Sequence, residues 1–135
     1  MSDPKALVLA GLEALNRGEL DRYYDSLAED FRYVTPAGTL IGRNAAREAD
    51  IPLFRQFSRH WRIADRVVAG GNKVVVWLRF GGTVRATGTS FELSLCDIFH
   101  VANGRIQSLE MHGDLSPMVA ALTATPASEA AIGCG

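Results

Sequence analysis

The second half of the sequence constrains the fold most, because apolar and polar residues alternate there between short glycine-rich breaks. Segments with the alternation of β-strands are about 60–69, 73–80, 83–101 (with a break near Gly88) and 105–112. The separators GGN, GG and ANG are typical of hairpin turns, so Gly70–Gly71 and Gly81–Gly82 are predicted to be turns. Successive hairpins predict an antiparallel sheet.

The first half predicts helices. Asp3 before Pro4 is a good helix start, and Gly18 is a natural stop. Apolar spacing predicts a helix at 19–28 and another at 44–58, which contains Pro52. Between them FRYVT is predicted to be a short strand, followed by a turn at Pro36-Ala37-Gly38. A last short helix is expected to begin near Leu115. Helices followed by hairpins predict an α+β fold, with the helices packed on one face of the sheet.

Composition limits the classes of function. A chain of 135 residues with 47% hydrophobic and 21% charged residues fits one folded domain, expected to cover 1–122. The alanine-, threonine- and serine-rich segment 123–135 is predicted to be a disordered tail. A net charge of -1 predicts no general attraction to nucleic acid or to an anionic membrane, and no apolar run is long enough to cross a bilayer.

Cysteine and histidine spacing predicts neither a disulfide framework nor a metal site. Cys96 and Cys134 lie in very different settings, and His60, His100 and His112 lack a short ligand spacing. The first residues lack the basic segment of a secretory signal, so a reducing, cytoplasmic location is expected. Neither a metal nor an organic cofactor is expected.

An aspartate interrupts the apolar face of one predicted strand, FELSLCDIFHV (91–101). Because strand side chains alternate between two faces, Asp97 falls on the same face as Phe91, Leu93, Leu95 and Phe99. A buried carboxyl holds its proton more tightly, so Asp97 is a candidate acid or hydrogen-bond donor.

A second acid lies on an apolar face of a predicted helix. Asp50 is four residues from both Ala46 and Phe54, and so belongs to their face. In an α+β fold this face looks toward the sheet, so Asp50 and Asp97 are predicted to point at each other. Two nearby carboxyls push their pKa values apart, which can supply a base and an acid near neutral pH.

Structural roles remain open for both acids at this point. Asp50 could reach solvent at the edge of its face, or accept hydrogen bonds near Pro52. Asp97 could be a core acid that is bonded to Tyr23 or Tyr24, or paired with an arginine. Arg62, Arg79 and Arg85 lie in predicted strands and could neutralise a substrate carboxylate, but surface positions are the simpler expectation.

Several stretches resemble the nuclear transport factor 2-like superfamily, within it the SnoaL-like and ketosteroid-isomerase-like branches. They are ALNRGELDRYYDSLAEDFRYVTPAG, IGRNAARE and CDIFHVANGRI, and the resemblance covers nearly all of 4–114. It implies a cone-shaped, curved antiparallel sheet wrapped around three helices, a cystatin-like α+β barrel with an apolar pocket. It also implies a homodimer formed through the outer face of the sheet.

The resemblance carries over to catalytic positions only in part. Asp97 matches the acid of ketosteroid isomerases, which donates a hydrogen bond to an oxyanion. Thr35 stands where their general base would be, and Gly11 stands near the position of their oxyanion tyrosine. Asp50 matches a supporting tyrosine, which implies that this position faces the pocket.

Two other enzyme patterns of the superfamily are also incomplete. SnoaL-like cyclases and limonene-epoxide-hydrolase-like enzymes carry an essential aspartate in the last strand, where this chain has about Met111. The hydrolase's arginine and aspartate pair matches about Leu78 and Phe80. The pocket is therefore expected, while the familiar catalytic sets are not.

These observations predict a cofactor-independent enzyme that acts on an apolar, oxygenated small molecule with a polyketide-, terpenoid- or steroid-like skeleton. The reaction would be acid–base isomerisation, cyclisation, dehydration or epoxide opening, with Asp97 as the acid and Asp50 as the base or water-activating group. The predicted substrate-binding walls are Tyr23, Tyr24, Trp61, Phe91, Leu93, Leu109 and Met111. The alternative is a non-catalytic ligand-binding or dimerisation module of the same fold.

Overall fold

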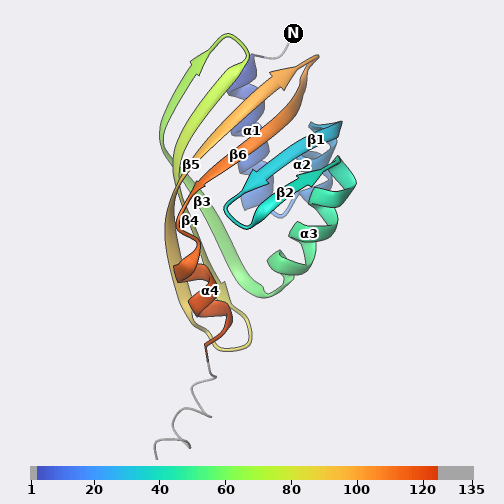
Figure 1. The fold of residues 1–135 in the computed structure, drawn as a ribbon. Helices are drawn as coiled ribbons and strands as arrows, with labels where there is room; N and C mark the ends of the chain where they lie inside the picture. The colour runs from blue at the N-terminus through green and yellow to red at the C-terminus, as the bar shows by residue number, and fades with distance from the viewer. Residues whose placement is uncertain (1–2, 125–135) are drawn as a thin grey trace, which may run out of the picture.

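The computed structural model of the chain describes residues 3–124, which form four helices and six strands. The elements are α1 (Pro4–Asn16), α2 (Leu20–Asp25), β1 (Leu27–Thr35), β2 (Gly38–Ile41), α3 (Arg43–Arg55), β3 (Phe57–Gly70), β4 (Lys73–Val84), β5 (Ser90–Ala102), β6 (Arg105–Gly113) and α4 (Ser116–Leu122). The strands make one curved sheet, with α1 against one face and α3 beside β1 and β2 (Figure 1). The predicted α+β class is confirmed.

The strand order is β2-β1-β6-β5-β4-β3. Strands β3 to β6 pair antiparallel through consecutive hairpins, and the turns predicted at GGN and ANG are two of the three connections. Two features were not predicted: β2 is a strand of its own, and β1 pairs parallel with β6. The parallel pair joins distant parts of the chain, so no local turn signals it.

Gly81 and Gly82 do not form a turn, contrary to the prediction. Both lie within β4, and the connection to β5 is residues 85–89, which include Gly88 with a φ of +73°. The indole of Trp61 covers Gly81 so closely that a Cβ there would lie 2.3 Å from its Cζ2 atom. Gly81 therefore serves close packing, a use of glycine that looks the same in sequence as a turn.

The ends of two predicted helices also differ. The helix expected at 44–58 ends at Arg55, and Phe57 begins β3 as a buried core residue. The helix expected at 19–28 is only Leu20–Asp25, because Leu27 already belongs to β1. Pro52 lies inside α3, in its last turn.

Strand β5 has the alternation that the sequence predicts. Its inward side chains are buried, namely Phe91, Leu93, Leu95, Asp97, Phe99 and Val101. Val8, Leu12 and Leu15 of α1 belong to the same core. Asp97 is thus placed by β5 among apolar side chains, facing the helices.

The described residues make up one sheet with its covering helices. The predicted tail falls almost entirely outside the described residues, since only Thr123 and Ala124 of it are included. None of the helices within 3–124 is long and apolar enough to span a membrane.

Candidate active site

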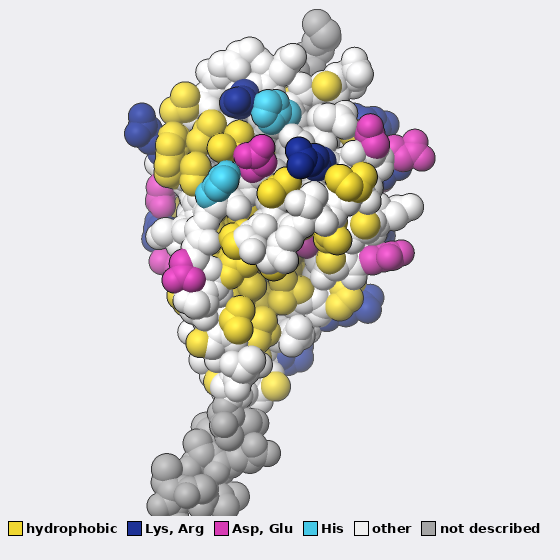
Figure 2. All heavy atoms as spheres, viewed as in Figure 1, with side chains coloured by type: hydrophobic (Ala, Val, Ile, Leu, Met, Phe, Trp, Pro, Cys, Tyr) yellow, Lys and Arg dark blue, Asp and Glu magenta, His cyan; other side chains and the backbone are white. Residues whose placement is uncertain are grey.

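A cavity of about 440 Å³ lies between the inner face of the sheet and helices α1, α3 and α4. Its size is in the range of small-molecule sites, and most of its lining is apolar. Figure 2 shows hydrophobic side chains gathered in the lower half of the face, between the places of α3 and α4 in Figure 1. The polar or ionisable side chains that line the cavity are Tyr23, Tyr33, Thr35, Thr39, Asp50, Arg62 and Asp97.

Asp97 enters the cavity from β5. The residue is only 4% exposed, and its Oδ1 atom has no hydrogen-bond partner among residues 3–124. Loss of water on burial raises the pKa of this carboxyl to about 7, although the charge of Arg62 acts in the opposite direction. Asp97 is therefore not the hydrogen-bonded core acid that was the structural alternative.

Asp50 enters the cavity from α3. Its Oδ2 atom accepts a hydrogen bond of 2.8 Å from the hydroxyl of buried Tyr24. Burial raises the pKa of Asp50 to about 6, while the Tyr24 bond and then the charge of Arg62 limit the rise. At neutral pH Asp50 is thus more ionised than Asp97.

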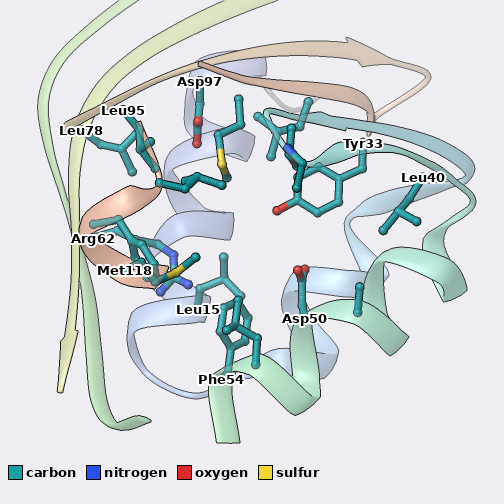
Figure 3. A pocket seen from close by; sticks show the side chains of 18 of the residues that line it. Leu15, Tyr33, Leu40, Asp50, Phe54, Arg62, Leu78, Leu95, Asp97 and Met118 are labelled. Atoms are coloured by element: carbon teal, nitrogen blue, oxygen red, sulfur yellow. The ribbon is translucent and has the colours of Figure 1, made fainter. Parts of the chain in front are cut away.

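The two carboxyls point into the same space from opposite walls (Figure 3). The other two sides of this space are formed by the Tyr33 hydroxyl and the Arg62 guanidinium. Burial and then the nearby Asp50 carboxyl raise the pKa of Tyr33 well above its usual range, so Tyr33 is a neutral hydrogen-bond donor at neutral pH. The arrangement offers an acid, a base and further donors around an apolar ligand.

Arg62 is a site residue that the sequence analysis assigned to the surface. Its guanidinium lies 5.1 Å from the ring centre of Phe54 and 4.8 Å from that of Phe80. Asn16 fixes the backbone: its Oδ1 accepts from the Arg62 N–H at 2.8 Å, and its Nδ2 donates to the Arg62 carbonyl at 2.9 Å. Loss of water lowers the pKa of Arg62 from its ordinary value.

An irregularity in β3 explains why Arg62 faces inward and Trp61 outward. The register of β3 with β4 shifts between Ala64 and Arg66, which reverses the alternation of side chains on the N-terminal side of this bulge. Arg62 then pairs with inward-facing Phe80, whereas Trp61 pairs with Gly81. The predicted role of Trp61 in the pocket wall is therefore wrong.

The remaining predicted wall residues divide into two groups. Tyr23, Leu109 and Met111 line the cavity. Tyr24, Phe91 and Leu93 are buried but do not line it. Tyr24 acts through Asp50, and Phe91 packs with the rings of Phe57 and Phe80 at the start of β5, with centroids 5.3 and 5.7 Å away.

The positions implied by the family resemblance lie at the cavity, with one exception. Thr35, Met111, Leu78 and Phe80 line it, and none of them offers a carboxylate. Gly11 does not line it, because the ring of Tyr23 covers this glycine at 3.3 Å from where a Cβ would stand. The ionisable groups of this cavity are thus Asp50, Arg62 and Asp97 together with two tyrosines.

A family model described as "SnoaL-like domain" matches residues 8–109. Because this match covers most of the chain, the protein belongs to the SnoaL-like family of the nuclear transport factor 2-like superfamily. No curated protein matches the sequence. The family includes cofactor-independent polyketide cyclases, so the fold is one that small-molecule enzymes use.

Several solved structures share this fold. A nuclear transport factor 2-like protein of unknown function from Burkholderia pseudomallei is 24% identical, with a TM-score of 0.81 over 92% of this chain and 100% of that one. IdmH, a putative polyketide cyclase from Streptomyces antibioticus, is 21% identical, with a TM-score of 0.78 over 91% and 100%. A putative SnoaL-like polyketide cyclase from Jannaschia sp. is also 21% identical, with a TM-score of 0.77 over 91% and 93%.

Proposed function

We propose that this SnoaL-like protein is a cofactor-independent enzyme that moves protons on an apolar, oxygenated small molecule such as a polyketide-like ketone. The observation that carries the proposal is the pair of carboxyls, Asp97 and Asp50, that face each other across one apolar cavity with raised pKa values. Acids with a purely structural role do not require a cavity between them. A catalytic pair does require one, because the substrate must bind between the two carboxyls.

Asp50 is the proposed base. With a pKa of about 6 it is mostly ionised at neutral pH, yet it holds a proton more tightly than an exposed carboxylate does. It takes a proton from the carbon next to a substrate carbonyl. The hydrogen bond from Tyr24 keeps the second carboxylate oxygen in place during this step.

Asp97 is the proposed acid. With a pKa of about 7 it is protonated in roughly half of the molecules at neutral pH, and it donates a hydrogen bond to the carbonyl oxygen as negative charge develops there. Return of the proton at another carbon gives isomerisation. Attack of the enolate carbon on a second carbonyl, whose oxygen takes up the proton that Asp50 removed, gives cyclisation. Loss of the resulting hydroxyl as water, with a proton from the adjacent carbon, gives dehydration.

The proposal is tested by hydrogen–deuterium exchange next to a carbonyl, with 2-tetralone in D₂O as an apolar ketone probe followed by proton NMR. The wild type is expected to accelerate exchange, and Asp50→Asn to lose at least tenfold of the acceleration. Glu48→Gln, an exposed neighbour on the same helix, is the matched control. Exchange no faster than in buffer would favour the non-catalytic ligand-binding module instead.

The proposal includes a homodimer formed through the outer face of the sheet and a cytoplasmic location, as the sequence predicts. Three large hydrophobic side chains are exposed on the outer face of β3 and β4, namely Ile63, Val68 and Trp77. Figure 2 shows hydrophobic side chains gathered at the upper left, where these strands lie in Figure 1. Association of two such faces would remove this apolar surface from water.

A further inference from the structure

Arg62 brings a positive charge into the cavity that no carboxylate of the described residues neutralises at contact distance. Among the described residues no Asp or Glu oxygen lies within 4.0 Å of it. Its one side-chain hydrogen-bond partner there is Nδ1 of His60, 3.0 Å from Nη1. Burial, and then the charge of Arg62, lower the pKa of His60 to about 4, so this imidazole is neutral and accepts the bond.

The guanidinium is also held in place. The rings of Phe54 and Phe80 lie within cation–π distance, and the His60 ring stacks on Phe54 with centroids 5.0 Å apart. Asn16 fixes the backbone of the same residue through two hydrogen bonds. A guanidinium has five N–H donors, so most of them remain available to a ligand in the cavity.

We propose that Arg62 binds a carboxylate of the substrate, which makes the substrate an apolar carboxylic acid. This inference rests on the proposed function, because it concerns the ligand of the same cavity. The planar fork of an arginine matches the two oxygens of a carboxylate. A phosphate fits less well, since a dianion would meet one arginine and the ionised Asp50.

The position of Arg62 also orients such a ligand. In Figure 3 Arg62 lies across the cavity from Tyr33 and Leu40, and Asp97 and Asp50 occupy the other two sides. A carboxylate bound at Arg62 would direct the apolar body toward Tyr33, between the two aspartates. The ionised group thus stays away from the carboxyls, and the reacting carbon lies between them.

Paired probes test the proposal by isothermal titration calorimetry at pH 7: 2-naphthoic acid and its neutral amide, 2-naphthamide. We expect the wild type to bind the acid at least tenfold more tightly than the amide, as charge-assisted hydrogen bonds imply. Arg62→Met should bring this ratio to about one, and Arg62→Lys should retain part of it. Arg59→Met is the control, because Arg59 lies on the same strand over the outward-facing Trp61 ring.

Equal binding of the two probes by the wild type, or no binding of the acid, would overturn the proposal. A folded Arg62→Met protein that still prefers the acid as strongly as the wild type does would also overturn it. If that variant does not fold, the ratio of acid to amide affinity in the wild type and in Arg62→Lys still tests the proposal. The test is independent of catalysis: Asp50→Asn should keep the preference for the acid, so failure of the exchange assay and failure of this assay are distinguishable.

Discussion

Asp97 and Asp50 face each other across one apolar cavity, and only Asp50 has a hydrogen-bond partner among the described residues. Strand β5 supplies the unbonded carboxyl, and helix α3 supplies the carboxyl that Tyr24 holds. This difference gives two carboxyls of the same chemical type different pKa values. It leads to predictions for stability, for proton affinity and for the packing around them.

Asp97→Asn is expected to stabilise the protein at pH 8 by roughly 2 kcal/mol and to destabilise it by a similar amount near pH 4. The folded-state pKa of about 7 lies above the ordinary value of 3.8, so the folded state binds more protons between these values and stability falls as pH rises through them. The pKa difference corresponds to about 4 kcal/mol between the two pH values. The amide's own burial costs the same at both, so it divides this difference into a gain at pH 8 and a loss near pH 4. Urea unfolding at both pH values measures the effect, and an equal effect at both would contradict the account.

Tyr24→Phe is expected to raise the pKa of Asp50 above about 6, because the lost hydrogen bond favours the ionised form. The acidic limb of the exchange rate with 2-tetralone should therefore move to higher pH, by on the order of one pH unit. Tyr33→Phe is the control, since it removes a cavity hydroxyl without a bond to Asp50. A profile that moves equally in both variants would contradict the role given to Tyr24.

Gly81→Ala is expected to destabilise the protein by roughly 2 kcal/mol, because the added Cβ would lie within 2.6 Å of three atoms of the Trp61 indole. Gly70→Ala, which meets nothing within 4 Å, is the control in the same hairpin. In a Trp61→Ala background the cost of Gly81→Ala should largely disappear. Urea midpoints that show the same cost with and without Trp61 would exclude the close contact.

Trp77→Glu is expected to convert a dimer into a monomer, because it places a negative charge among the hydrophobic side chains that are exposed on the outer face of β3 and β4. Sedimentation velocity at several protein concentrations measures the change. Ile41→Glu alters an exposed hydrophobic residue on β2 and should leave association intact. A wild type that sediments as a monomer at all concentrations would contradict the proposed dimer.

The periods of single strands and helices correctly predicted that Asp97 and Asp50 face the cavity. The two-residue period of 91–101 placed Asp97 on the inner face, and helical spacing placed Asp50 on the cavity side of α3. Both hold because β5 pairs with β4 without a register shift and Asp50 lies within the helical residues of α3. The period predicts the wrong face where a bulge causes an interruption in a strand.

Arg62 and Trp61 show such an interruption. A bulge between Ala64 and Arg66 exchanges the faces of the residues before it, and nothing in the local sequence marks its position. The signal that could have found Arg62 is its register with Phe80, which needs the hairpin pairing rather than the strand alone. The parallel pairing of β1 with β6 escaped prediction for a related reason, since it depends on contacts between distant segments.

Titration of the Asp97 carboxyl by ¹³C NMR measures whether this side chain is shielded from water, with Asp97→Asn used to assign the resonance. We expect an apparent pKa near 7 for Asp97 and near 6 for Asp50. An ordinary carboxyl pKa near 4 for Asp97 would show that its side chain is hydrated. That result would contradict its assignment as the acid of an apolar site.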